Sequence, residues 1–498
     1  MKNIPSLHHA AVVLAVLFIS SCASVPTPMK NSAAPAPSSP TGIARPAAAT
    51  EPAAETSGQS EVPASPGATA PGGGIAATKP LPNEPALRQT REAAIASSAG
   101  SKAASQQRTG AIRQTAVDEL LSRMTVEQKV GQLLMITVSD PTTGLELASL
   151  DSRFRSLFRT LQPGGVILFG GNLDTVPQSI RLINALQEMS RVRLFVATDE
   201  EGGTVSRLNA SGHIPATPIP SAQVIGETQD PQLAYETGRV IGEEMGALGF
   251  NMDLAPVADV LTNPRNVVIG TRSFGTQAQL VARMVAEEVR GLQSVGICAV
   301  LKHFPGHGGT ANDTHISTVV DPEPFSTMKR IALVPFERGI DAGASAILIA
   351  HVEYPDVTGS RTPASLSPAI VNHLLRRELG FNGVIMTDAM NMAAITKFAP
   401  PDEAAVDAIR AGCDIVLMPQ DVPAVYRALL AAVRDGSIPE RRLDESVRRI
   451  LALKERMHIL TPQAEATVAE ADSIIGNSTH RSLVRRIFAE ETARRTSY

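Results

Sequence analysis

Eight short apolar runs recur along the middle of the chain and constrain its fold more than any other feature. Each run is almost continuously apolar and rich in Val, Ile or Leu, and the segments between them have the spacing of amphipathic helices. The runs lie at 133–137, 165–169, 194–197, 252–255, 297–301, 346–350, 384–386 and 415–418. Such runs are typical of parallel strands that helices cover on both faces. Eight strand-then-helix units in about 345 residues predict an α/β fold, a single (β/α)8 TIM-type barrel, with a doubly wound open sheet as the alternative.

Titratable residues follow several of these runs, at the strand ends where barrel enzymes place their active sites. Asp199 comes after the third run, and Arg272 lies in the segment that follows the fourth. Both suit contacts to a polar ligand, and the alternatives are a solvated acidic turn and a surface ion pair. Asp388 lies just beyond the seventh run. A carboxylate there suits a nucleophile or base, and an N-cap of the next helix is an even alternative.

The segment 302–315 holds the densest group of reactive side chains. It contains one lysine, three histidines and one aspartate, namely Lys302, His303, His307, Asp313 and His315. Its glycines and proline predict a loop after the fifth run. As metal ligands, the three histidines would suit a metal-dependent barrel hydrolase. Their spacing matches no compact zinc pattern, however, and the lysine would place a positive charge beside the ion.

General acid and base catalysis is the second interpretation of this loop. Asp313 and His315 lie two residues apart, so the carboxylate can accept a hydrogen bond from the ring, fix its tautomer and favour the imidazolium. A histidine tuned in this way donates a proton to a leaving group and then takes one from water. We favour this interpretation, which requires neither a metal nor a cofactor.

The motifs between residues 120 and 460 together resemble glycoside hydrolase family 3, in particular its bacterial NagZ-type β-N-acetylglucosaminidases. The most specific part of the resemblance is Lys302-His303-Phe304-Pro305-Gly306-His307-Gly308 followed by Asp313-Thr314-His315. The β-glucosidases of the family lack the Asp-x-His pair. The segments 201–203, 255–260, 272–275 and 350–352 also fit the family.

This resemblance implies a catalytic domain over 115–460 and a retaining double displacement on terminal β-linked N-acetylglucosamine, from a glycan or a muropeptide. It implies that Asp388 is the nucleophile and that His315, assisted by Asp313, is the acid and base. The residues that would hold the sugar are Asp199, Arg272, Lys302 and His303. Related chains often have an arginine where this chain has Thr204, which puts that contact in doubt. Arg207 lies close by and is assigned to the substrate.

The first 114 residues differ from the rest of the chain. The apolar stretch 10–19 is too short to span a bilayer and is typical of a secretory signal, and the small residues before Cys22 resemble a bacterial lipobox. We predict a lipoprotein signal peptide over 1–22 with acylation of Cys22, and a plain signal peptide with a chance cysteine is the alternative. The Ala-, Pro- and Ser-rich stretch 23–114 is predicted to be a disordered linker.

Partners and location follow from these features. A lipid anchor predicts a cell-envelope lipoprotein, and Ala23 after the cysteine favours the outer membrane, facing the periplasm. A net charge of −4 without a basic block argues against nucleic acid as a partner. A monomeric catalytic domain is expected, followed by a tail over 461–498 with one helix at about 481–495. A cell-wall-binding lipoprotein without catalysis is the remaining alternative.

Overall fold

The computed structural model describes residues 116–311, 313–314, 316–461 and 464–497. The predicted signal peptide, Cys22 and linker lie outside the described residues, as does His315. Within the described part, no helix is both long and apolar enough to cross a membrane.

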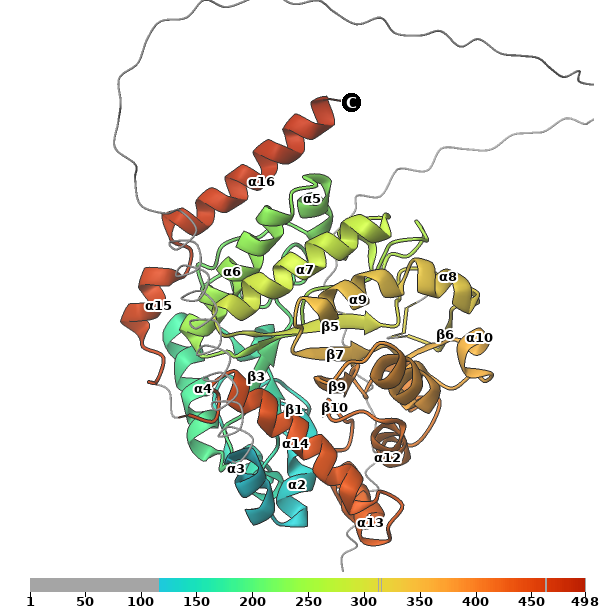
Figure 1. Cartoon of the computed structure of the whole chain (residues 1–498). Coiled ribbons are helices and arrows are strands. Elements are labelled where there is room, and N and C mark those ends of the chain that lie inside the picture. The colour runs from blue at the N-terminus through green and yellow to red at the C-terminus, as the bar shows by residue number, and fades with distance from the viewer. Residues whose placement is uncertain (1–115, 312, 315, 462–463, 498) are drawn as a thin grey trace, which may run out of the picture. The chain divides into compact units, whose positions relative to one another are not determined.

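Eight parallel strands form the centre of the domain (Figure 1). In the order of the sheet they are β10 (Val416–Leu417), β1 (Leu134–Thr137), β2 (Gly165–Ile167), β3 (Phe195–Thr198), β4 (Met252–Asp253), β5 (Cys298–Phe304), β7 (Ala346–Ile349) and β9 (Val384–Thr387). A parallel bridge between Met386 and Ile415 joins the two ends of this order, and Thr387 N donates to Ile415 O at 3.0 Å. The (β/α)8 barrel is therefore confirmed, and the open-sheet alternative is wrong.

Each predicted apolar run overlaps one of these strands. All seven residues of β5 are buried, as are the four of β3, β7 and β9. Burying a Val, Leu or Ile side chain stabilises the fold by about 1.5–3 kcal/mol, so runs that are apolar on both faces favour the centre of the barrel. Cys298 and Cys413 are buried free thiols.

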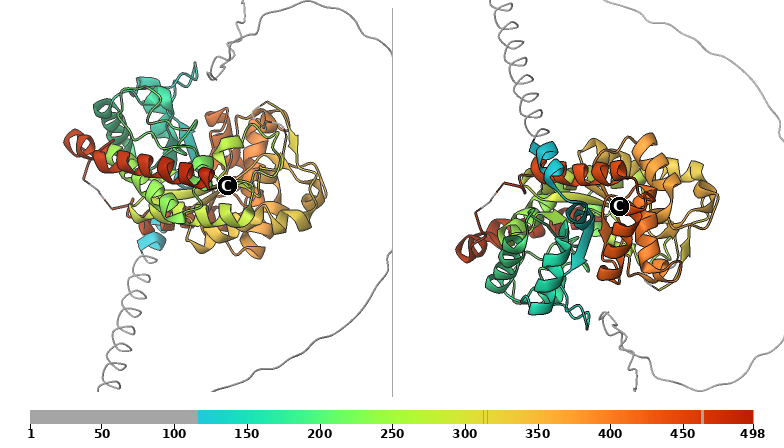
Figure 2. Two further views of the ribbon diagram at one scale, coloured as in Figure 1. Left: turned by 90° about the horizontal axis from the view of Figure 1, so that it is seen from above. Right: turned by 90° about the horizontal axis from the view of Figure 1, so that it is seen from below.

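Helices cover the outside of the barrel (Figures 1 and 2). They include α2 (Val126–Gln132), α3 (Ser152–Leu161), α4 (Val176–Met189), α5 (Ala222–Glu227), α6 (Pro231–Leu248), α7 (Ala278–Ser294), α8 (Phe325–Arg330), α9 (Leu333–Asp341), α12 (Pro401–Ala411), α13 (Val422–Arg434), α14 (Glu440–Arg456) and the π-helical segment η4 (Ala369–Glu378). The Thr125 side chain accepts from Gln128 N, and the Gln128 side chain accepts from Thr125 N in return, so α2 begins with a capping box.

Two helices follow the barrel at the C-terminus. The longer one, α16 (Ser478–Thr496), contains the predicted tail helix and lies beside α5 and α6 (Figures 1 and 2). The shorter one, α15 (Val468–Ile474), was not predicted. Its seven residues include a single buried side chain, that of Ala471, which is too little for an amphipathic pattern.

Candidate active site

A pocket of about 390 Å³ opens at the carboxyl ends of the strands. This volume lies within the usual range for small-molecule sites. Its lining includes all five predicted sugar-binding residues and the predicted nucleophile, namely Asp199, Arg207, Arg272, Lys302, His303 and Asp388. Residues up to 189 positions apart in sequence therefore meet because their strands end at the same edge of the barrel.

Lys302 forms the centre of a buried ion-pair cluster in this pocket. It lies on β5, and its Nζ is 2.6 Å from Asp199 Oδ1 and 2.5 Å from Glu201 Oε1. Burial by itself would lower the pKa of this ammonium group, but the two carboxylates raise it above its usual value. Lys302 is therefore a fixed positive charge in the pocket, with its donors aimed at the loop after β3.

Glu201 also binds Arg272 through both carboxylate oxygens. Arg272 Nε and Nη2 lie 2.8 Å from Oε2 and Oε1, and Nη1 donates to Val268 O at 3.1 Å. Although burial favours the neutral acid, Lys302 and Arg272 hold the pKa of Glu201 well below its usual range. The two carboxylates of Asp199 and Glu201 thus balance two cations, which is what a buried charged cluster requires.

His303 is oriented by a carboxylate that sequence reasoning did not assign to the site. Asp259 Oδ2 lies 2.7 Å from His303 Nδ1, and Oδ1 accepts the His307 backbone N–H at 2.6 Å. Because the carboxylate only accepts, Nδ1 carries a proton. Arg272 Nη2 lies 3.4 Å from Nε2. Asp259 therefore holds the His303 ring in one orientation beside the guanidinium.

His307 lies behind this cluster as a buried neutral ring. Its Nδ1 is 2.8 Å from Thr310 Oγ1, and burial, followed by the charge of His303, lowers its pKa. Among the described residues, no group of three or more His, Cys, Asp or Glu side chains could hold a metal ion.

Asp388 directly follows β9, and it lines the pocket. Its backbone N–H donates to Ile349 O at 2.9 Å, and its Oδ1 accepts from Ala389 N at 2.8 Å. The next helix, α11 (Ala393–Thr396), has Met392 as its N-cap, so the N-cap alternative for Asp388 is wrong. The Asp388 carboxylate lines the same pocket, and its charge partly offsets the lowering of the His307 pKa.

The β5 loop reaches the pocket through Thr314. This residue lines the pocket, and its carbonyl accepts the backbone N–H of Ala394, shortly after Asp388. Asp313 forms a turn in which its carbonyl accepts from both Ile316 N and Ser317 N. The predicted acid and base, His315, lies outside the described residues. Thr314 therefore joins this loop to the segment that follows Asp388.

Arg207 reaches the pocket because a buried glutamate folds its loop back. Glu200 Oε2 accepts the backbone N–H groups of Arg207 at 2.7 Å and Leu208 at 3.0 Å. The Arg207 guanidinium then lies 3.9 Å from Asp199 Oδ2 and 5.7 Å from the centre of the Phe169 ring. Thr204 is exposed and does not line the pocket.

Glu201 and Asp259 are the functional side chains that the sequence analysis left unassigned. Each is an acid shortly after a predicted strand, Glu201 after the third and Asp259 after the fourth. That position was the available signal. Which acids point into the pocket depends on the turn that each loop makes, and several acids share these loops.

Comparison with known proteins identifies the family. Residues 125–453 match the glycosyl hydrolase family 3 N-terminal domain. β-Hexosaminidase A of Pseudoalteromonas piscicida is 34% identical, over 72% of this chain and 65% of its own length, just under two thirds. A β-hexosaminidase of Nitrosomonas eutropha is 37% identical, over 59% of this chain and 85% of its own length.

Solved structures show the same relationship. The family 3 β-N-acetylglucosaminidase of Paenibacillus sp. str. FPU-7 superposes with a TM-score of 0.69 at 39% identity, over 74% of this chain and 69% of that one. The barrel agrees with this likeness. The chain belongs to glycoside hydrolase family 3.

Proposed function

We propose that this protein is an exo-acting β-N-acetylglucosaminidase that removes terminal N-acetylglucosamine with retention of configuration. The observation that carries the proposal is a pocket with the Asp388 carboxylate on one wall and the Lys302–Arg272 cluster on another. The relatives named above as β-hexosaminidases and as a β-N-acetylglucosaminidase support this substrate class.

Asp388 is the proposed nucleophile. In the first step its carboxylate oxygen bonds to the anomeric carbon while the bond to the leaving oxygen breaks. His315, as the imidazolium paired with Asp313, gives its proton to that oxygen. In the second step the neutral ring takes a proton from water, the water oxygen bonds to the anomeric carbon, and the Asp388 carboxylate leaves. Two inversions at one carbon retain its configuration.

The ion-pair cluster is proposed to hold the sugar. Asp199, Lys302, Arg272, His303 and Arg207 present acceptors and donors that match ring hydroxyls and an acetamido group. Because their mutual ion pairs already order these side chains, little reorganisation is needed when the sugar binds. A preorganised cluster stabilises the transition state more than flexible surface groups would.

Peptidoglycan fragments are the proposed natural substrates, and the outer membrane, facing the periplasm, is the proposed location. Support for the location comes from the lipobox around Cys22 and the long Ala-, Pro- and Ser-rich segment after it. A chain of roughly 90 residues has a mean reach on the order of 50 Å, which would let a monomeric barrel sample the space beside its anchor.

The first test measures nitrophenol release from 4-nitrophenyl N-acetyl-β-glucosaminide by the purified protein in EDTA. Turnover in EDTA supports the glycosidase and excludes an essential chelatable metal. Activity that returns only with added zinc favours the metal-dependent hydrolase. Sugar binding without turnover in either condition favours a cell-wall-binding protein. Running the assay in phosphate and identifying the sugar product tells water from phosphate as the acceptor: water yields N-acetylglucosamine, whereas phosphate yields its 1-phosphate.

A further inference from the structure

The turn between α15 and α16 packs tightly against the loop that follows β3. A β-carbon added at Gly476 would lie 2.0 Å from the Pro215 carbonyl oxygen, and φ is +63°, so only glycine fits there. Gly476 N donates to Glu244 Oε1 of α6 at 2.9 Å. The C-terminal segment therefore packs closely against the barrel at this turn and forms a hydrogen bond with it.

Glu244 is the centre of that contact. Its side chain is 4% exposed, and its Oε1 lies 2.8 Å from His480 Nδ1. The other ring nitrogen, Nε2, lies 2.9 Å from Glu243 Oε2. With a carboxylate at each nitrogen, the ring is held as an imidazolium. Burial lowers the pKa of His480, but the hydrogen bonds to both glutamates raise it above its usual value.

The same carboxylate holds the loop after β3. Thr217 N donates to Glu244 Oε2 at 2.8 Å, and Thr217 Oγ1 donates to Oε1 at 2.6 Å. Ile219 N then donates to Thr217 O at 2.8 Å, and Gly203 N donates to Ile219 O at 2.9 Å. Gly203 lies two residues after Glu201, so hydrogen bonds join α16 to the backbone beside the ion-pair cluster.

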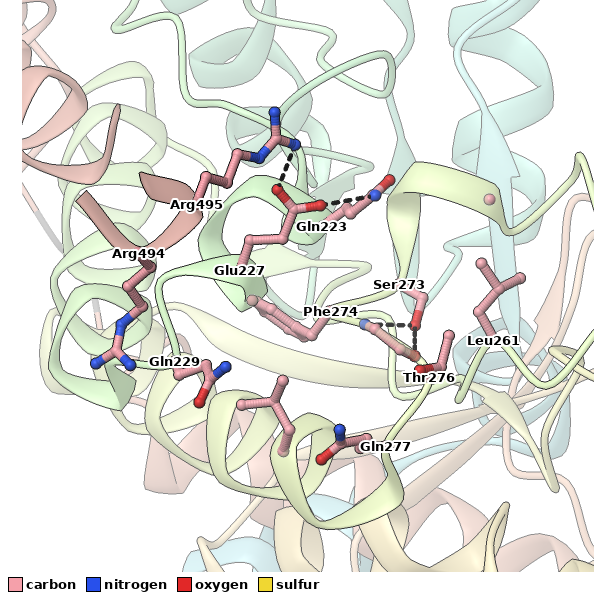
Figure 3. Close-up of a pocket in the computed structure, with 14 residues that line it drawn as sticks. Gln223, Glu227, Gln229, Leu261, Ser273, Phe274, Thr276, Gln277, Arg494 and Arg495 are labelled. Carbon is pink, nitrogen blue, oxygen red and sulfur yellow. Dashed lines mark hydrogen bonds and ion pairs between the residues drawn. The ribbon is translucent and has the colours of Figure 1, made fainter. Parts of the chain in front are cut away.

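A second route reaches Arg272. Near the end of α16, Arg495 Nη2 lies 2.8 Å from Glu227 Oε2 of α5 (Figure 3). Gly226 also lies on α5, and a β-carbon added there would lie 1.8 Å from the Phe274 carbonyl oxygen. Helix α5 therefore lies directly against the segment that carries Arg272. A pocket of about 320 Å³ is lined by Ser273 and Phe274 of this segment and by Arg494 and Arg495 of α16 (Figure 3).

We propose that the C-terminal segment, α15 and α16, is a positioning element of the active site, with His480 and Glu244 holding the loop that carries Asp199, Glu201 and Arg207. The segment lies beyond residues 125–453, the part that matches the family domain. The inference rests on the proposed function, because it assigns sugar contacts to that loop. Without His480, the Glu244 carboxylate loses a charged donor and its hold on Thr217 weakens.

The test compares His480→Ala, Thr217→Val and the double variant in the full chain. We expect each single variant to raise KM for the aryl glycoside about three- to tenfold with a smaller change in kcat. Because both act through Glu244, the double variant should raise KM by less than the product of the two single effects. His480→Gln, which keeps one donor, should restore part of the loss. Arg486→Ala is the matched control and should leave KM unchanged. Arg486 lies on α16, as His480 does, and the change removes its ion pair with Glu236 of α6.

Hydrogen exchange of the 201–219 segment gives a readout that does not depend on turnover. His480→Ala should speed exchange at Gly203 and Thr217, and Arg486→Ala should not. An unchanged KM together with unchanged exchange in His480→Ala would overturn the proposal, as would fully multiplicative KM effects in the double variant. If the unaltered protein lacks glycosidase activity but its loop still loosens in His480→Ala, the positioning role stands and the proposed function fails.

Discussion

Glu201 accepts two parallel hydrogen bonds from Arg272, each 2.8 Å long, while its Oε1 also lies 2.5 Å from Lys302 Nζ. One carboxylate thus joins the loop after β3 to the loop after β4 and to β5. Bidentate pairing of this kind fixes the geometry as well as the charge. Asp199, Arg207 and His303 line the same pocket as the Glu201 carboxylate.

Glu201→Gln should therefore lower both sugar affinity and stability. The amide keeps the volume but removes the carboxylate that pairs with both Lys302 and Arg272, and breaking a buried pair costs about 3–5 kcal/mol. Urea denaturation measures the stability and titration with N-acetylglucosamine measures the affinity. Glu378→Gln, which breaks the exposed pair with Lys329, is the control and should change neither. A Glu201 variant as stable as the unaltered protein would show that the cluster does not need this charge.

Asp388→Ala should remove turnover and leave the fold intact, because its carboxylate would form the covalent bond to the sugar. A fall in kcat of at least about a thousandfold is expected for a lost nucleophile. Adding azide should restore some turnover and give a glycosyl azide of inverted configuration, since the small anion replaces the carboxylate in a single displacement. Near-normal activity without azide would remove Asp388 from this role.

His315→Ala should impair substrates with poor leaving groups most. A nitrophenolate leaves without full protonation, whereas a sugar hydroxyl needs the proton that His315 would supply. The ratio of kcat/KM for a chitooligosaccharide to that for the nitrophenyl glycoside should therefore fall. Asp313→Asn should shift this ratio in the same direction. An equal loss on both substrates would contradict the acid role.

Lys454 should make stability depend on pH. Its Nζ is buried and donates a hydrogen bond to Gln132 Oε1 at 2.9 Å, and burial lowers its pKa from 10.5 to about 7. Between pH 7 and 10.5 the unfolded chain binds more protons than the folded one, so this group makes stability rise with pH. Below pH 7 the full cost of burying the charge is present. Lys454→Met should therefore stabilise the protein most at pH 6, by up to a few kcal/mol.

Denaturation at several pH values measures this effect. Glu288 acts in the opposite sense between pH 4.5 and 8, because burial raises its pKa to about 8. The informative quantity is thus the difference between Lys454→Met and the unaltered protein at each pH. A difference that does not shrink as pH rises from 7 to 10 would rule out this titration.

Cys22→Ala should release the protein from membranes. A thioether-linked lipid is the only membrane attachment predicted from the sequence, and stable anchoring needs more than one acyl chain. Fractionation of cells followed by detection in the soluble and membrane fractions gives the answer. A variant that remains in the membrane fraction would contradict the lipobox interpretation. Thr27→Ser, which lies beyond the lipobox and keeps the acceptor sulfur, is the control.

The barrel was predictable because a local sequence pattern marks each of its strands. Each of the runs from 133–137 to 415–418 is apolar on both faces, and that pattern needs no knowledge of distant residues. Asp388 and Lys302 could be selected for the same reason, since each lies at or just beyond the end of a run. The α15 helix was not predictable, because its seven residues are stabilised by contacts with α4 and α6 and not by a pattern of their own.

The pairing of the charged groups was decided by the tertiary structure. Sequence placed Asp199, Glu201 and Asp259 after strands, but their partners lie from 44 to 103 residues away, at Lys302, Arg272 and His303. The same holds for His480, whose partner Glu244 is 236 residues distant. Local sequence determined which elements form and which residues lie at the strand ends. The closed barrel alone determined which charges meet, because ion pairing depends on distance through space and the barrel sets that distance.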